Sequence, residues 1–76
     1  MIEELSLVRL IRPISSPAIP VGSIGTVLIV YEDTPPAYEV EFIDVEGTTL
    51  EDPETDESTF TVSEDDVEPW LEKLEA

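Results

Sequence analysis

The sequence predicts an all-β protein built from about five short antiparallel strands. Residues 26–31 (Thr-Val-Leu-Ile-Val-Tyr) are almost entirely β-branched, aliphatic or aromatic, which is typical of a strand. Residues 38–43 alternate apolar and acidic side chains with the period of two that a half-buried antiparallel strand requires. Pro13, Pro17 and Pro20 exclude a helix or a central strand after the first apolar run, because each fixes φ and removes a backbone donor.

The first predicted strand covers residues 5–11 (Leu-Ser-Leu-Val-Arg-Leu-Ile), with aliphatic residues on both faces of the pleat. Its short length and Pro13 argue against a helix. Residues 13–22 form a predicted loop. Gly22 and Gly25, three residues apart, then predict a tight turn that needs positive φ or a close backbone approach.

The strand at residues 38–43 follows a predicted hairpin connection at residues 32–36. We expect its apolar positions to face the core; they are Tyr38, Val40 and Phe42. Its carboxylates, Glu39 and Glu41, are expected to face outward. A second turn at Glu46 and Gly47 follows this strand.

The remaining chain predicts a return strand and a final strand. Residues 48–50 begin the return strand, and residues 59–62 are strand again, with Phe60 and Val62 inward. Ser63 can cap a helical turn, but Pro69 limits this segment to a single 3-10 turn. Residues 68–71 are the predicted last strand, and residues 72–76 are expected to fray.

This order of elements predicts a small SH3-like barrel with a 3-10 turn before its last strand. The chain of 76 residues forms one predicted domain with a core from about residue 5 to residue 71. Small all-β chains close or nearly close so that few strand edges stay open. An OB-fold is the alternative, although it usually needs more residues and a helix between its third and fourth strands.

Composition excludes several classes of function. The chain has 19 acidic and 3 basic residues, a formal net charge of −16, and neither His nor Cys. A thiolate nucleophile, a Cys/His zinc site and a His general base are therefore impossible. Direct binding of nucleic acid is not expected, because such affinity depends on Lys and Arg at the phosphates. We predict no catalytic residue and no cofactor.

The predicted location is the cytoplasm, with no membrane partner. The N-terminal residues Met-Ile-Glu-Glu are acidic and do not resemble a secretory signal. No apolar stretch approaches the ~18 residues of a membrane span. The anionic chain is also expected to be repelled by anionic lipid headgroups.

The distribution of the carboxylates is the main candidate functional feature. No Lys or Arg occurs between Pro13 and Glu72, whereas 16 acidic residues occur from Glu32 to Glu72. Both arginines, Arg9 and Arg12, lie at the first predicted strand. A field of one sign destabilises the compact state by self-repulsion and attracts cationic partners. The acidity therefore either attracts a basic protein or serves solubility, and the sequence leaves both interpretations open.

The acidic segment also resembles the beginning of a metal-binding loop. Asp52, Glu54 and Asp56 have the spacing that begins a Ca²⁺-binding EF-hand loop. The sixth position, which needs Gly, is Glu57, and the twelfth, which needs Glu, is Ser63. The sequence therefore predicts no dedicated metal site. Residues 51–57 are instead expected to form a mobile, solvated loop.

Four segments of the chain are informative when taken together. They read Pro-Val-Gly-Ser-Ile-Gly-Thr-Val at residues 20–27, Tyr-Glu-Val-Glu-Phe at 38–42, Gly-Thr-Thr at 47–49 and Asp-Val-Glu-Pro at 66–69. This set resembles a family of small bacterial SH3-like proteins of unknown function. The Gly-x-x-Gly-Thr-Val turn also resembles the KOW-type turn of ribosomal and transcription-factor barrels. The resemblance implies the fold and no function. KOW relatives bind RNA through basic loops, which this chain lacks.

We therefore predict a non-catalytic protein-binding module. Its most concrete form is an acidic partner or inhibitor of a basic protein, comparable to an antitoxin or immunity protein. The predicted contact residues are Glu32, Asp33, Glu39, Glu41, Glu51, Asp52, Glu54, Asp56, Glu57, Glu64, Asp65 and Asp66, with Ile29 and Tyr31 as apolar anchors. The alternative is an accessory or scaffold domain that self-associates, for example as a homodimer, through an exposed strand.

Overall fold

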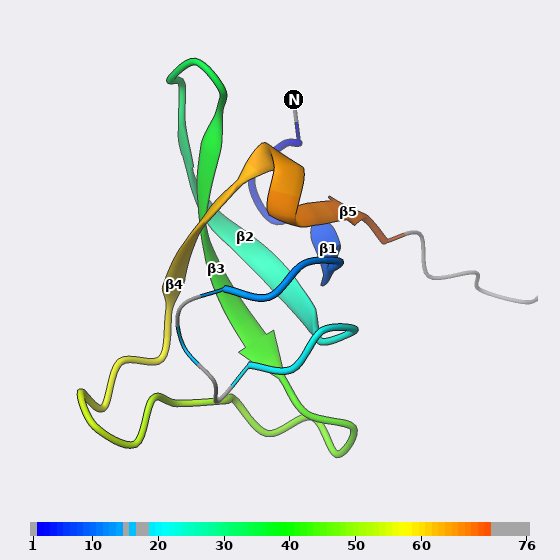
Figure 1. Ribbon diagram of the computed structural model, residues 1–76. Coiled ribbons are helices and arrows are strands. Elements are labelled where there is room, and N and C mark those ends of the chain that lie inside the picture. Colours follow the sequence, from blue (N-terminus) through cyan, green and yellow to red (C-terminus); the bar gives the residue numbers. More distant parts are fainter. Residues whose placement is uncertain (1, 15, 17–18, 71–76) are drawn as a thin grey trace, which may run out of the picture.

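A computed structural model describes residues 2–14, 16 and 19–70 (Figure 1). The elements are β1 (Leu7–Leu10), β2 (Ile24–Tyr31), β3 (Ala37–Ile43), β4 (Phe60–Ser63), the 3-10 helix η1 (Glu64–Asp66) and β5 (Val67–Pro69). All strand pairs are antiparallel in one five-stranded sheet of order β4-β3-β2-β1-β5. The predicted all-β fold, with a 3-10 turn before the last strand, is confirmed.

The order of the strands requires the sheet to curl. β4 and β5 lie at opposite edges of the sheet, yet only the three residues of η1 separate them in the chain. Three residues of 3-10 helix span about 6 Å. The two edges therefore approach each other at this end, and the sheet wraps round its core, as Figure 1 shows.

The long central hairpin is formed by β2 and β3. Its register pairs Val27 with Val40, and then shifts between Val27 and Ile29, which leaves Leu28 as an extra residue in β2. Beyond the shift, Val30 packs against the core whereas Ile29 is exposed. A bulge of this kind reverses which residues of a strand face inward.

One hydrophobic core lies inside the curled sheet. Its buried side chains are Val8, Leu10, Ile19, Val27, Tyr38, Val40, Phe42, Phe60, Val62 and Val67. The inward positions predicted for the third strand and for residues 59–62 are therefore confirmed. Tyr38 is fully buried, and its hydroxyl accepts a hydrogen bond from the Ile2 backbone N–H (2.9 Å) and donates to Glu64 Oε1 (3.4 Å).

Gly22, before β2, and Gly25, near its start, serve the two purposes that the sequence suggests. Gly22 adopts a φ of +99°, which L-residues rarely adopt. Gly25 instead lies where β2 and β3 approach closely. A Cβ atom there would be 2.5 Å from Val40 Cγ1 and 2.9 Å from the Glu41 carbonyl oxygen.

Several predicted boundaries were wrong. β1 ends at Leu10, so Arg12 lies beyond the strand. At the other end, Leu5 has a φ of +68°, which is incompatible with strand geometry. β2 begins at Ile24, two residues earlier than predicted, because it pairs with β1 from that residue. The last strand ends at Pro69, and Leu71 and residues 72–76 lie outside the described residues.

The predicted return strand at residues 48–50 was also wrong. Thr49 forms only an isolated bridge with Ile43, and the Leu50 N–H donates one further bond to the Phe42 carbonyl (2.9 Å). The next residues are acidic and include Pro53, which has no N–H to donate. The chain therefore leaves the sheet there and pairs with β3 again only at β4.

Candidate interaction surface

The outward face of the central strands carries a row of paired side chains. Glu39 of β3 lies opposite Ile29 of β2 and opposite Thr61 of β4. Because residues directly opposite each other in antiparallel strands point to the same face, these side chains form a row across the sheet. Tyr31 lies two residues beyond Ile29, on the same face.

Glu39 is held in this row by hydroxyl groups. Thr59 Oγ1 donates to Glu39 Oε2 (2.7 Å), while Thr61 Oγ1 (2.7 Å) and the Tyr31 hydroxyl (3.3 Å) donate to Oε1. These donors are neutral, so they orient the carboxylate without cancelling its charge. Partial burial, followed by the charge and the hydrogen bond of Glu39, raises the pKa of Tyr31 above its usual 10.0. Tyr31 therefore remains a protonated donor at neutral pH.

Apolar side chains border this carboxylate. Ile29 is 45% exposed and Tyr31 is 38% exposed, and the bulged Leu28 is exposed as well. The two predicted apolar anchors therefore lie beside Glu39 with surface available for contact. Exposed apolar side chains grouped with an oriented charge are typical of a protein interaction surface.

A cleft of about 600 Å³ opens beside Glu39. Its lining residues are Pro13, Ile14, Ser16, Glu39, Asp56, Glu57, Ser58, Thr59, Phe60, Thr61 and Asp66. Four of these are carboxylates, so the cleft extends the acidic character of the outward face. Two residues of the predicted acidic loop, Asp56 and Glu57, are thereby placed near Glu39.

The acidic loop at residues 51–57 is solvated, as predicted. Hydrogen bonds to the Asp52 carboxylate also link parts of its backbone. Asp52 Oδ1 accepts from the Glu54 and Thr55 N–H groups (2.8 and 3.3 Å), and Asp52 Oδ2 accepts from the buried Ser16 hydroxyl (2.9 Å). The Glu54 N–H, and then Ser16, lower the pKa of Asp52 below its usual value. The Asp52 carboxylate is therefore occupied by hydrogen bonds within the protein, whereas Glu51 is exposed.

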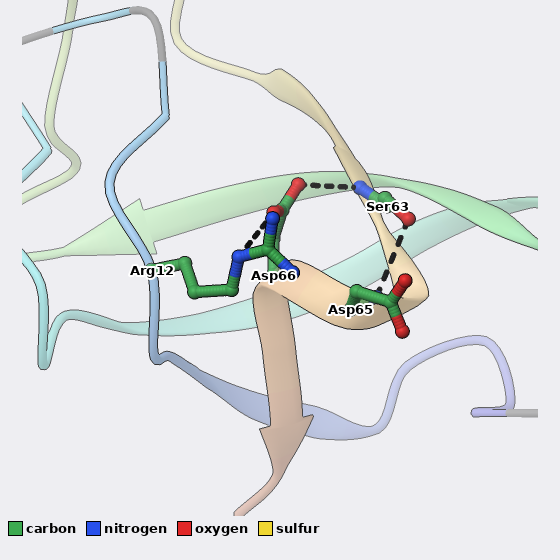
Figure 2. A network of polar contacts seen from close by, with 4 residues as sticks. All are labelled: Arg12, Ser63, Asp65 and Asp66. Atoms are coloured by element: carbon green, nitrogen blue, oxygen red, sulfur yellow. Dashed lines mark hydrogen bonds and ion pairs between the residues drawn. The ribbon is translucent and has the colours of Figure 1, made fainter.

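The acidic residues of η1 have different surroundings (Figure 2). Asp66 Oδ2 accepts from the Ser63 N–H (2.9 Å), and Oδ1 lies 3.7 Å from Arg12 Nε. Ser63 Oγ accepts from the Asp65 N–H (3.3 Å), which completes a capping box. Glu64 Oε1 accepts from the Tyr38 hydroxyl. Asp66 and Glu64 therefore stabilise the fold, and Asp65 is the exposed carboxylate of this turn.

The remaining predicted contact residues lie in two places, on the outward face itself and in the connection between β2 and β3. Glu41 lies two residues beyond Glu39 and pairs with Thr26, so it shares the outward face. Glu32 and Asp33 are exposed in the connection between β2 and β3. The structure thus brings Glu41 close to the row, whereas the acids of the connection form its border.

The arginines of the described residues are occupied elsewhere. Arg9 Nη2 lies 2.7 Å from Glu68 Oε2, and Arg12 pairs with Asp66. The third basic residue, Lys73, is outside the described residues. In residues 2–14, 16 and 19–70, no basic side chain therefore forms an ion pair with Glu39 or Glu41. Within the same residues, no three carboxylates are grouped so that they could hold a metal ion.

Sequence reasoning missed a second concave surface, an apolar groove on other elements. Its lining residues are Leu7, Pro20, Val21, Gly22, Ser23, Ile24, Ile43, Asp44, Val45, Leu50 and Trp70. These residues come from four separate parts of the chain, which a pattern in one segment cannot reveal. One signal was available: Val45 is an apolar residue in an acidic turn, where nothing in the alternation requires it.

The sequence profile of a family described as Domain of unknown function (DUF4926) matches residues 4–62. The chain belongs to the DUF4926 family. The DUF4926 match includes the row around Glu39 and ends before η1, β5 and Trp70. Comparison with curated proteins found no match, and comparison with solved structures found none. No helix in the described part of this DUF4926 chain is long and apolar enough to cross a membrane.

Proposed function

We propose that this DUF4926 protein is a non-catalytic binding module that binds a basic protein through the outward face of β2, β3 and β4. One observation carries the proposal. Glu39 is held in position by three hydroxyl donors, lies beside the exposed Ile29 and Tyr31, and is paired with neither Arg9 nor Arg12. A fixed charge beside apolar anchors is suited to recognising a cationic surface.

The two kinds of side chain contribute differently to such an interface. The carboxylates raise the rate of encounter with a basic protein and repel nucleic acid and other acidic molecules. The apolar anchors, once covered, supply most of the affinity. Glu39 is already oriented, so little side-chain entropy is lost when it pairs with Lys or Arg.

The concrete form of the proposal is an acidic inhibitor, comparable to an antitoxin or immunity protein, in the bacterial cytoplasm. The charge of −16 on 76 residues supports it, because such a surface can cover the basic cleft of a nucleic-acid-binding protein. We also propose that the fold is SH3-like. The strand order β4-β3-β2-β1-β5, with η1 directly before β5, supports that assignment.

The test is to capture a partner with the immobilised full chain and then to titrate the purified partner by calorimetry. We expect a basic protein whose affinity falls as salt is raised. The variants Ile29→Ser and Glu41→Gln should weaken binding. The control variants Leu5→Ser and Glu3→Gln change exposed residues of the segment before β1, outside the three strands of this face, and they should bind as the wild type does.

The proposal is overturned if the affinity of the partner depends neither on salt nor on the variants Ile29→Ser and Glu41→Gln. A homodimer without a basic partner would instead support the alternative, an accessory or scaffold domain. That alternative has less support, because the sheet edges are short. β4 has four residues and β5 has three, and Pro69 in β5 cannot donate to an added strand.

A further inference from the structure

The apolar groove lies apart from the acidic cleft and shares no lining residue with it. It has a volume of about 720 Å³. One wall is the turn at residues 20–24 and another is the end of β3 with the turn that follows it. Trp70 and Leu7 close it from the side of β5 and β1.

Several side chains in this groove expose large apolar surfaces. Val45 is fully exposed, Val21 is 54% exposed, and Ile43 and Trp70 are each 37% exposed. Val45 lies in a turn and packs against nothing in the core, so stability does not explain it. Exposed apolar residues that converge on one concavity are typical of a site for a ligand or for a partner's side chains.

The Trp70 side of the groove is held in place. The Trp70 N–H donates to the Leu7 carbonyl (2.9 Å), which fixes the backbone at this point. The Arg9 guanidinium lies 5.4 Å from the indole centroid and also pairs with Glu68. This cation–π contact holds the ring, and Glu68 neutralises the charge of Arg9. The wall therefore exists before any ligand arrives.

The charges near the groove select among possible occupants. Asp44 lines the groove, and the exposed Glu46 follows Val45 in the same turn. A second copy of the chain would bring another −16 of charge to this surface. Acidic peptides would be repelled in the same way. A segment that places apolar side chains in the groove and basic side chains at its rim matches both features.

We propose that this groove binds a short segment of a partner protein in which apolar residues alternate with Lys or Arg. The inference rests on the proposed function, since the same basic partner would supply the segment, but it depends on different residues. Val21, Val45 and Trp70 would contact the apolar side chains, while Asp44 and Glu46 would face the basic ones.

Trp70 provides the readout, because it is the one tryptophan of the chain and lies in the groove. The probe is a synthetic peptide of alternating Leu and Lys. Binding should shift the Trp70 emission to shorter wavelength in a saturable way. Two control peptides, one of alternating Ser and Lys and the other of alternating Leu and Glu, should leave the emission unchanged. A shift by the Ser–Lys peptide as large as that by the Leu–Lys peptide would overturn the proposal, because charge alone would explain it.

Variants separate this groove from the outward face. Val45→Ser should weaken binding of the Leu–Lys peptide about tenfold, since it removes a valine side chain that the bound peptide would cover. Ile29→Ser, an equally conservative loss on the outward face, should leave peptide binding unchanged. If Val45→Ser binds as the wild type does, or if Ile29→Ser weakens binding equally, the groove is not the site.

Other occupants would also appear in this experiment. If deletion of residues 71–76 shifts the Trp70 emission to longer wavelength and raises peptide affinity, the chain's own end covers the groove and the proposal fails. If dilution of the protein alone produces that shift, a second copy is the occupant and the proposal fails. If no peptide binds but a captured basic protein still depends on Ile29 and Glu41, the groove proposal fails and the proposed function stands.

Discussion

Gly25 lies where β2 and β3 approach too closely for a side chain. A Cβ atom would contact Val40 Cγ1, Phe42 Cδ1 (2.8 Å) and the backbone oxygen of Glu41. We expect Gly25→Ala to lower the free energy of unfolding by about 1–3 kcal/mol, because buried side chains and backbone would have to move. Urea denaturation measures this change.

Gly47 provides the matched control. Its φ is +86°, but nothing lies within 4 Å of the position of its Cβ. Asn is the non-glycine residue that best tolerates this conformation, so Gly47→Asn should cost less than about 1 kcal/mol. Equal losses for Gly25→Ala and Gly47→Asn would show that the close approach at Gly25 is unimportant.

The pairing of Tyr31 with Glu39 can be tested by titrating the phenol. Partial burial, and then Glu39, raise the pKa of Tyr31, so we expect Glu39→Gln to lower that pKa towards its usual 10.0. The folded-state pKa lies above the unfolded one. The resulting stabilisation is therefore complete below the unfolded pKa and is lost as pH rises through the folded pKa. Ultraviolet absorbance follows the titration.

A control is needed because the chain has two tyrosines. Tyr31→Phe removes the transition that belongs to Tyr31, and what remains belongs to Tyr38. If the Tyr31 transition is the same in the wild type and in Glu39→Gln, Glu39 is not held beside it as described.

Among the elements, the 3-10 helix η1 depends on the side chain of Asp66 more than on that of Asp65. Asp66 accepts from the Ser63 N–H and lies near Arg12, whereas Asp65 contributes only its backbone N–H (Figure 2). Asp66→Ala should therefore lower the free energy of unfolding by about 1 kcal/mol, as loss of a cap usually does. Chemical denaturation provides the measurement.

Asp65→Ala is the matched control, because it removes the same charge one residue away. Its effect should stay within about 0.5 kcal/mol, with relief of repulsion acting in its favour. If the two variants are equally stable, the capping box does not stabilise the connection between β4 and β5.

Elements with a strong local pattern could be predicted from the sequence, and those set by distant contacts could not. β3 alternates cleanly because one face is core, and the capping box of η1 is visible in the spacing of Ser63 and Asp66. The return strand at residues 48–50 was wrong because the chain leaves the sheet after Leu50, and β4 then pairs with β3 only at residues 37–40. The bulge at Leu28 has no local signal.

The candidate surface follows the same division. Alternation predicted that Glu39 and Glu41 face outward, and the structure places Ile29 and Tyr31 on the same face. The hydroxyl donors to Glu39 come from Tyr31, eight residues away, and from Thr59 and Thr61, 20 and 22 residues away. Only the pairing of β4 with β3 brings the two threonines next to Glu39, so the sequence pattern alone could not reveal these contacts.

At the scale of the whole molecule, the charge should make stability depend on salt. The described arginines neutralise only Glu68 and Asp66, so the other described acids repel one another across a small globule. We expect the Tm to rise from low to moderate NaCl concentration, because ions screen that repulsion. Thermal unfolding followed by circular dichroism tests this; a Tm that stays flat or falls would contradict it.

The central claim is that the acidity belongs to a binding surface with a defined geometry. The most direct test is calorimetric titration of the captured basic partner into wild type, Ile29→Ser and Leu5→Ser across a series of salt concentrations. We expect the affinity to fall with salt for all three proteins, and only Ile29→Ser to bind more weakly than wild type, by about tenfold. Equal affinities for Ile29→Ser and Leu5→Ser would contradict it, because the charge would then attract partners without a site.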